Sequence, residues 1–444
     1  MTRPMRHSLS YHSAMIFVTL WVLFTCTEGL AEDTVKNEWA ISVTSELSDV
    51  SQPRVMTVRD AVDRALLYDE GIAAARDAIW DAERQKVSAR QWRDPELRPS
   101  QSDERNQLSV RLYVPNPWVR MHRVDAAVST ENAVSAEMER AMWLLRTHVR
   151  RSFVEIGFLD RDLAAVGKLV ELYREVLELA KQRLSGGQAV APELVPVSGR
   201  YLTTLSDRDQ AERRRAKARR ELAAMVMLPV HQLVLATDNE ENLPTDLTDL
   251  CLPDLEQKAI RNRGDLQASS WRANAEFATC QESRSERIPW FSHVQASRTK
   301  ETGGGDEWSV EVAISIPVFS WSSRTPALAA ARYHRLQAAA QEAPRRIACE
   351  VRSAWHATED ALAARRLHEE RVGPVVSDLN TLHEELRKTE GMYQAQVIDV
   401  RIQLLAVERT KLRLTQDVMQ ALIQLEEAVG MPLSSPSSLE KSNP

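Results

Sequence analysis

A regular alternation of apolar and polar residues marks the stretch from Trp308 to Phe319. Every second residue up to Ile316 is apolar, and the residues between them are small or polar. Side chains of a β-strand point to opposite faces in turn, so this pattern predicts a strand with one apolar face. Pro317 should end the strand because proline has no N–H to donate to a neighbouring strand. The apolar positions include Trp308, Val310, Val312 and Ile314.

The same pattern occurs about two hundred residues earlier in the chain. A strand is predicted from 106 to 114, before Pro117, with apolar positions at Leu108, Val110, Leu112 and Val114. A partner strand is expected before each of these two strands, at 96–102 and 288–299. A long charged helical segment follows in both places. A unit that occurs twice indicates an internal tandem repeat.

Most of the remaining chain has the period of an α-helix. The predicted helical segments are 57–92, 118–184, 189–227, 254–287, 324–388 and a last helix that ends near 428. Apolar residues from Leu159 to Leu184 recur in steps of four and three, which indicates a coiled-coil seam. A kink is expected at Pro344. The predicted fold is mainly α with a small β part: long antiparallel helical hairpins, in an α-barrel or coiled coil, with four strands per chain.

The order of these elements predicts a division of the chain. The expected parts are a signal peptide at 1–31, an extended lead-in at 32–56, a first repeat at 57–245, a second repeat at 246–432 and a disordered tail at 433–444. The signal peptide is indicated by basic residues, an apolar run of about 11 residues and a small-residue cleavage site before Glu32. That run is too short to serve as a membrane anchor. Cys26 partly matches a lipoprotein cleavage site and is a candidate for lipidation.

The composition argues against several functional classes. The net charge is −6 and basic residues alternate with acidic ones, so no basic stripe for nucleic acid is present. No Ser-His-Asp motif, phosphate loop or nucleotide fingerprint occurs, and the ten histidines are scattered. We therefore expect neither an enzyme nor a cofactor or metal site. Cys251, Cys280 and Cys349 are expected to be buried small hydrophobic residues.

Four strands per chain are too few to close a barrel, yet two of them carry an unpartnered apolar face. Three copies would supply twelve strands, an even number within the range of outer-membrane barrels. Tryptophans flank the predicted strands, as in the aromatic girdles of such barrels. These tryptophans are Trp118, Trp290, Trp308 and Trp321. The alternative is a periplasmic coiled-coil adaptor or structural rod with two small hairpins.

Several motifs in this order resemble the TolC family of outer-membrane efflux proteins. They are the stretch Trp308–Phe319 followed by Arg324, the sequence Asn262-Arg263-Gly264-Asp265-Leu266, and the paired helix breaks. The stretch Asp94–Leu97 looks most like the heavy-metal efflux (CzcC-like) branch. The resemblance implies a homotrimer in outer-membrane lipid that extends into the periplasm. It would be the exit duct of a tripartite efflux or type I secretion system, with an adaptor protein and an inner-membrane pump. Gly264 departs from the family, which has proline there.

The two helix breaks align with each other. The stretch that begins at Gly186-Gly187 places Glu193 six residues after the turn, and the stretch from Tyr393 places Asp399 at the matching position. Tyr393 stands where the family has glycine. An acid at the start of a helix is also stabilised by the helix dipole alone. The resemblance adds that a ring of three Asp399 carboxylates could line a periplasmic aperture that admits cations, metal ions among them.

Overall fold

The computed structural model describes residues 54–102, 105–187, 192, 194–236, 247, 250–301, 305–316, 325–388 and 394–433. These residues are mainly helical with a small sheet part, as predicted. The first elements are β1 (Arg54–Met56), α2 (Val58–Tyr68), α3 (Glu70–Arg90), β2 (Glu96–Gln101), β3 (Arg105–Leu112), α4 (Pro117–Ser185) and α5 (Leu194–Met225). Next come η2 (Val230–Gln232), β4 (Leu233–Leu235), α6 (Leu252–Asn262), α7 (Gly264–Ser285), β5 (Trp290–Glu301), β6 (Asp306–Ser315), α8 (Thr325–Lys388) and α9 (Gln394–Val429). The order α2–α3–β2–β3–α4–α5 recurs as α6–α7–β5–β6–α8–α9, and the exact division into two repeats stays a prediction.

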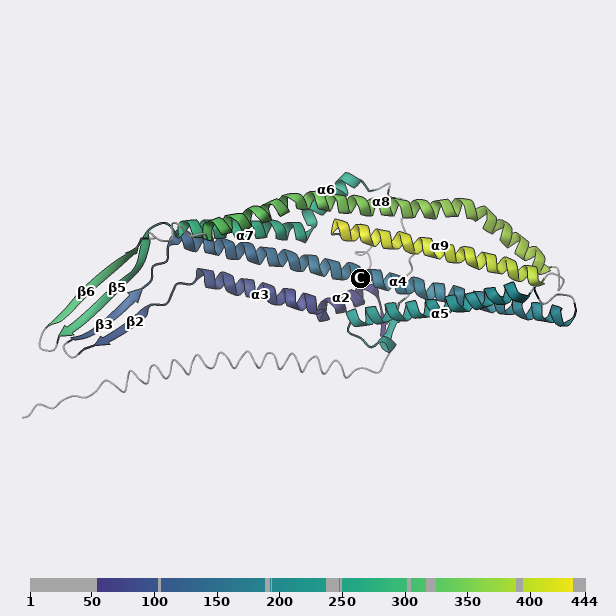
Figure 1. The fold of residues 1–444 in the computed structure, drawn as a ribbon, viewed down its shortest axis with the longest axis horizontal. Helices are drawn as coiled ribbons and strands as arrows, with labels where there is room; N and C mark the ends of the chain where they lie inside the picture. Colours follow the sequence, from purple (N-terminus) through teal and green to yellow (C-terminus); the bar gives the residue numbers. More distant parts are fainter. Residues whose placement is uncertain are drawn as a thin grey trace, which may run out of the picture. The chain divides into compact units, whose positions relative to one another are not determined.

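Helix α4 is the central element of the part of the chain after residue 54. It contacts α2, α3, α5, α7 and α9, while α8 contacts α6, α7 and α9 (Figure 1). Its 69 residues correspond to about 100 Å at 1.5 Å per residue. Asn116 starts the helix by accepting a hydrogen bond from the backbone N–H of Trp118 at 3.0 Å. The four-stranded sheet extends from the end of the helices at which α4 begins (Figure 1).

Two of the predicted helices are in fact pairs of helices. The first one does begin as expected, because Thr57 and Asp60 form a capping box. It then breaks at Asp69, whose side chain accepts a hydrogen bond from the N–H of Ile72 at 2.9 Å and starts α3. The segment 254–287 breaks at Arg263, which has an extended backbone. The helical spacing of apolar residues continues across both breaks, so the sequence pattern did not reveal them.

The described hydrophobic residues form two main cores, one in each half of the chain. The first lies between α2, α4 and α5 and includes Val149, Ile156 and Leu222. The second lies between α6, α8 and α9 and includes Ile347 and Leu425. Short helices of each half are thus held by apolar burial against the long ones, which is the main source of stability for helices of this kind.

The coiled-coil seam predicted on α4 is only part of its buried surface. Val166 and Val170 are buried, as that seam requires. Leu169 and Leu172 are also buried, and they pack against Ile398 of α9. A helix with neighbours on several sides needs more than one apolar stripe.

One further expectation was wrong. Cys251 and Cys349 are exposed, and of the three cysteines predicted to be buried only Cys280 is. Cys251 precedes α6 as its N-terminal capping position, outside the packed helix. The described part of α5 begins at Leu194, and the predicted start at 189 lies outside the described residues.

Candidate functional site: the sheet and the helix ends

The sheet has the strand order β2-β3-β5-β6, with antiparallel pairing throughout. Residues directly opposite each other on paired strands share a face of the sheet. Val110 on β3 lies opposite Ala296 on β5, which lies opposite Val310 on β6. Within the described residues β2 and β6 are the two edges. The register therefore assigns every strand residue to one of two faces.

One face of the sheet is apolar and open. Nine large hydrophobic side chains on it are 41 to 74% exposed, with Val310 the most exposed, while Val294 on the same face is half-buried. The nine come from all four strands: Leu97, Leu108, Val110, Leu112, Phe291, Trp308, Val310, Val312 and Ile314. The alternation predicted for β3 and β6 is confirmed by this register. An apolar surface of this extent is costly in water and is normally covered.

The opposite face is polar and closely hydrogen-bonded. Ser109 and Ser297 are each only 5% exposed. The hydroxyls of Ser297 and Ser309 lie 2.7 Å apart, and Arg111 donates to Gln295 at 2.8 Å. Burial on this face is confined to the serines of the two inner strands, because Ser309, Glu311 and Ser315 of the edge strand β6 are exposed. A half-buried sheet of a water-soluble protein instead buries its apolar face.

Aromatic residues lie at both ends of the sheet. The rings of Trp118, at the start of α4, and Trp290, the first residue of β5, meet edge to face with centroids 5.4 Å apart. Trp308 lies near the other end of β6, where the guanidinium of Arg298 is 5.7 Å from its ring centroid. Trp321 lies outside the described residues. Tryptophans therefore lie near both ends of the strands, and the exposed apolar side chains lie between them.

The strand ends differ from the predicted ones by up to two residues. Strand β3 ends at Leu112, so Val114 follows the strand and is not part of it. Pro115 and Pro117 follow, and a residue before proline is restricted in conformation. Strands β2 and β3 have 6 and 8 residues, fewer than the 9 to 11 of a typical transmembrane strand. Pro99 lies within β2, where an edge position tolerates a missing N–H.

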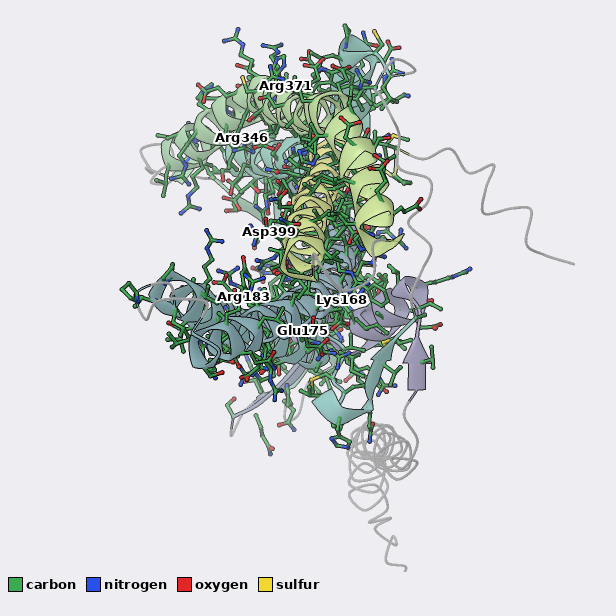
Figure 2. The ribbon with its side chains drawn as sticks, turned by 90° about the vertical axis from the view of Figure 1, so that its right-hand side faces the viewer. Lys168, Glu175, Arg183, Arg346, Arg371 and Asp399 are labelled. Atoms are coloured by element: carbon green, nitrogen blue, oxygen red, sulfur yellow. The ribbon has the colours of Figure 1, made fainter. Side chains whose placement is uncertain are left out.

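The other end of the molecule is formed where α4 ends and α9 begins. The N–H of Gly186 donates to the carbonyl of Gln182, and Gly187 has φ +71°, in the left-handed region that favours glycine. Asp399 lies in the second turn of α9 and is exposed. Gln403 donates to its carboxylate at 3.3 Å. Figure 2 faces this end and labels Asp399 on α9 and Arg183 on α4. Glu193 and Tyr393, like Cys26, lie outside the described residues.

Ion pairs join α4 to both helices that return from this end. Arg409 of α9 donates to Asp162 of α4 at 2.5 and 3.1 Å, and both side chains are mostly buried. The hydrogen bond that Arg409 donates to Asp162 is the main cause of the raised pKa of Arg409. Two residues away, Asp160 pairs with Arg215 of α5. These partners are far apart in sequence, and no local spacing could have identified them.

The chain is similar to several known proteins. It is 24% identical over 304 residues to an uncharacterized protein of Haemophilus influenzae, and the match covers 65% of this chain and 65% of that relative. No protein-family model matches the sequence. The fold is similar to a crystal structure of a membrane protein from Pseudomonas aeruginosa, with a TM-score of 0.69 and 17% identity. That similarity covers 84% of this chain and 90% of the other.

Two similar solved structures are named as channels or outer-membrane proteins. One is the outer membrane protein VceC of Vibrio cholerae, with a TM-score of 0.65, 17% identity and coverage of 85% of this chain and 97% of VceC. The other is CusC, described in terms of transmembrane channel formation, with a TM-score of 0.64, 17% identity and coverage of 86 and 93%. The chain has the fold of these proteins.

The helices differ from membrane spans in composition. None of those in the described ranges combines the length and the apolar character that crossing a bilayer requires.

Proposed function

We propose that this chain is one subunit of a TolC-family outer-membrane channel, a passive exit duct rather than an enzyme. The observation that carries the proposal is the extended apolar face of the sheet, on which Val310 is 74% exposed, backed by a face of serine, glutamine and charged residues. Transmembrane β-barrels have this arrangement, because lipid covers the apolar side and the lumen is polar. The fold shared with VceC and CusC supports the proposal.

The barrel would be completed by other copies of the chain. Edges β2 and β6 carry backbone groups that lipid cannot satisfy, so an open sheet is not viable in a bilayer. Pairing β6 of one copy with β2 of the next gives twelve strands in a homotrimer. Strands β5 and β6, with 12 and 10 residues, are long enough to cross the hydrocarbon region.

Helix α3 supports the same assembly. Helix α7, its counterpart in the element order, lies against both α4 and α8. Helix α3 has α4 on one side, while Trp80 and Val87 stay 61 and 57% exposed. The two side chains are seven residues apart and share one face of the helix. A helix of a neighbouring copy would cover this face, as α8 covers α7.

The helices define the rest of the proposed role. An outer-membrane barrel with helices about 100 Å long would extend into the periplasm and conduct cargo across it. Its partners would be a periplasmic adaptor and an inner-membrane pump, in a tripartite efflux or type I secretion system. Metal cations are the cargo suggested by the resemblance to the heavy-metal branch and by the exposed acid Asp399.

Fractionation of cells distinguishes the proposed outer-membrane channel from the alternative, a soluble periplasmic rod. The protein should remain with outer membranes and need detergent for extraction, and mass photometry should give the mass of three chains. Release of the protein by osmotic shock would contradict the proposal and favour the rod.

A double variant, Trp80→Glu with Val87→Glu, should shift the measured mass from three chains towards one chain. Leu67→Glu is the control, because Leu67 on α2 is an apolar residue of similar exposure. This change should leave the trimer intact.

A further inference from the structure

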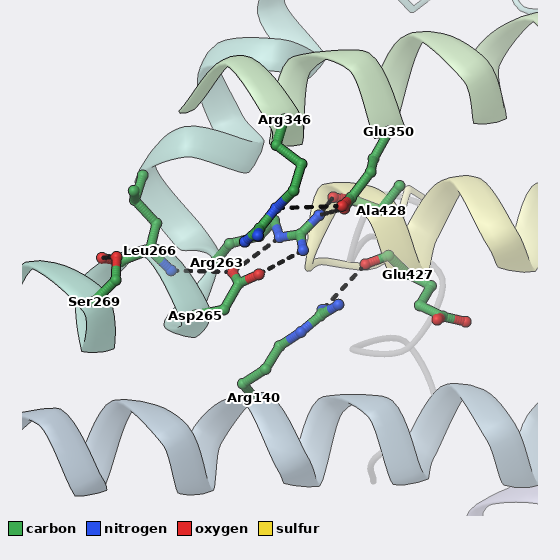
Figure 3. Close-up of polar contacts among 9 residues, drawn as sticks. All are labelled: Arg140, Arg263, Asp265, Leu266, Ser269, Arg346, Glu350, Glu427 and Ala428. Carbon is green, nitrogen blue, oxygen red and sulfur yellow. Dashed lines mark hydrogen bonds and ion pairs between the residues drawn. The ribbon is translucent and has the colours of Figure 1, made fainter. Parts of the chain in front are cut away.

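A cavity of about 430 Å³ lies where α4, α8, α9 and the start of α7 meet. Arginines from three different elements line it: Arg140 of α4, Arg263 before α7 and Arg346 of α8 (Figure 3). Ser353 and Gln424 add polar side chains to its wall. The volume falls within the range of about 300–1,000 Å³ that is typical of small-molecule sites.

Arg263 is a structural arginine in this cluster. Its side chain is 4% exposed. It donates to Asp265 at 2.6 and 3.0 Å, to Glu350 at 2.5 Å and to the carbonyl of Ala428 at 3.3 Å. Burial disfavours its charge, but the two carboxylates outweigh burial and raise its pKa. Its hydrogen-bonding capacity is largely used within the protein.

Arg140 is in a different position. It donates to the backbone carbonyl of Glu427 at 3.2 Å, and no carboxylate of the described residues lies within ion-pair distance of it. The carboxylate of Glu427 is turned towards Arg151, to which it is bonded at 2.8 Å (Figure 3 shows it pointing away from Arg140). Burial and the nearby charge of Arg263 lower the pKa of Arg140. Asp265, Glu427 and Glu350 oppose this shift from a distance, but none of them forms a direct ion pair with Arg140. A half-buried guanidinium without a direct ion pair is costly, and an anion would relieve that cost.

Arg346 and Arg140 approach Arg263 from opposite sides, Arg346 from α8 and Arg140 from α4 (Figure 3). Its side chain is mostly exposed, and its Nε is 3.7 Å from Glu350, which already holds Arg263. Asp265 and Glu350 pair with Arg263 and Arg346, and Glu427 pairs with Arg151, so Arg140 is the guanidinium of this cluster without a direct ion pair and one positive charge is left over. The surplus charge faces a space that a small molecule can enter.

We propose that this cavity is a binding site for a small oxyanion, bearing either a phosphate or a carboxylate group, with Arg140 and Arg346 as its charged ligands. Both groups accept paired hydrogen bonds from guanidinium, which makes arginine the preferred residue for them. A bound anion would connect α4 to α8 and stabilise the junction between the two halves of the chain. The site does not depend on the channel function proposed above.

Isothermal titration calorimetry of the full chain in detergent tests the site. Sodium phosphate and sodium succinate are titrated separately at constant ionic strength, with sodium chloride as the reference. Saturable binding of phosphate alone assigns a tetrahedral ligand, and binding of succinate alone assigns a carboxylate. Arg140→Gln should weaken binding about 10- to 100-fold, because a hydrogen bond to a charged group is lost. Arg346→Gln, at a mostly exposed position that tolerates change, should also weaken it.

Arg215→Gln is the matched control, because Arg215 is an arginine of α5 that has its own carboxylate partner, Asp160. It should leave the affinity for the anion unchanged. Equal heats with chloride would overturn the proposal, as would unchanged affinity in both Arg140→Gln and Arg346→Gln. Failure to bind either oxyanion would also overturn it, whether or not the protein proves to be a channel.

Discussion

Gly264 lies directly against Ala136: a Cβ atom on Gly264 would stand 2.3 Å from the carbonyl oxygen of Ala136. Gly264 is the first residue of α7, and Ala136 belongs to α4. No side chain fits between the two backbones at this point. Glycine at this position therefore permits a close approach of two helices in this chain.

Gly264→Ala should destabilise the protein, because α4 or α7 must move to admit the methyl group. Overpacking of this kind costs about 1–3 kcal/mol. The measurement is the midpoint of chemical denaturation. Gly167→Ala is the control: Gly167 lies within α4, and a Cβ atom on it would meet no other atom within 4 Å. Alanine should therefore stabilise the helix there by up to about 1 kcal/mol. Equal effects of the two changes would show that the close approach is not maintained.

Val312→Arg should strongly reduce insertion into the outer membrane if the apolar face meets lipid. A charge on that face costs about 2–4 kcal/mol near the bilayer midplane. The yield of heat-resistant trimer in outer membranes measures it. Ser315→Arg on the polar face should be much milder, because that side chain would face water in the lumen. For a soluble sheet Val312→Arg would be harmless, since Val312 is already exposed.

Glu426 should make the protein less stable as the pH rises. Burial raises the pKa of this carboxyl, although Arg150 and the N–H of Leu433 act in the opposite direction. The folded state therefore binds the proton more tightly than the unfolded state does. The stability that this proton provides is full below the unfolded pKa of about 4.5 and is lost as the pH rises through the folded value.

Denaturation of the native protein and of Glu426→Gln from about pH 4 to about pH 8 tests this linkage. Relative to the variant, the native protein should lose stability across that window and then level off. Asp265→Asn provides the contrast. Burial would raise the pKa of Asp265, but Arg263 lowers it, so that carboxyl contributes stability at neutral pH that is lost at acid pH. If the Glu426 difference rose with pH instead, the pair with Arg150 would outweigh burial.

Asp399→Ala should raise single-channel conductance or reduce cation selectivity in a planar bilayer, and weaken block by multivalent cations. The reason is that three exposed carboxylates around a symmetry axis would attract cations and hold them weakly. The stability of the trimer should change by no more than about 0.5 kcal/mol, as for most exposed residues. If conductance, selectivity and block all stayed unaltered, Asp399 would be only a favourable acid near a helix start.

Much of the fold followed from local patterns. The alternation at Val310 and Val312 predicted the strand and its two faces, because the direction of a side chain on a strand depends only on its neighbours along the chain. The helix from 118 to 184 followed in the same way, and its ends agree with the structure to within one residue. Thr57 was identified as a helix start because capping acts over three residues.

Other features depended on contacts between distant segments. The break at Arg263 is fixed by Glu350 and by the carbonyl of Ala428, both more than 80 residues away. The burial of Leu169 and Leu172 depends on α9, which a period along α4 alone does not describe. The same holds for Arg140, whose surplus charge is visible only once the surrounding helices meet around it.

The sequence by itself determined which face of each strand is apolar and where the long helices run, since both depend on interactions a few residues apart. Only the tertiary structure decided that the apolar faces of all four strands form one open surface, and that Ser109 and Ser297 are buried on the other face. That outcome depends on the pairing of β3 with β5, strands nearly 180 residues apart, and on the hydrogen bonds across the polar face. Side-chain exposure is a property of neighbours in space, and a sequence pattern contains only the neighbours along the chain.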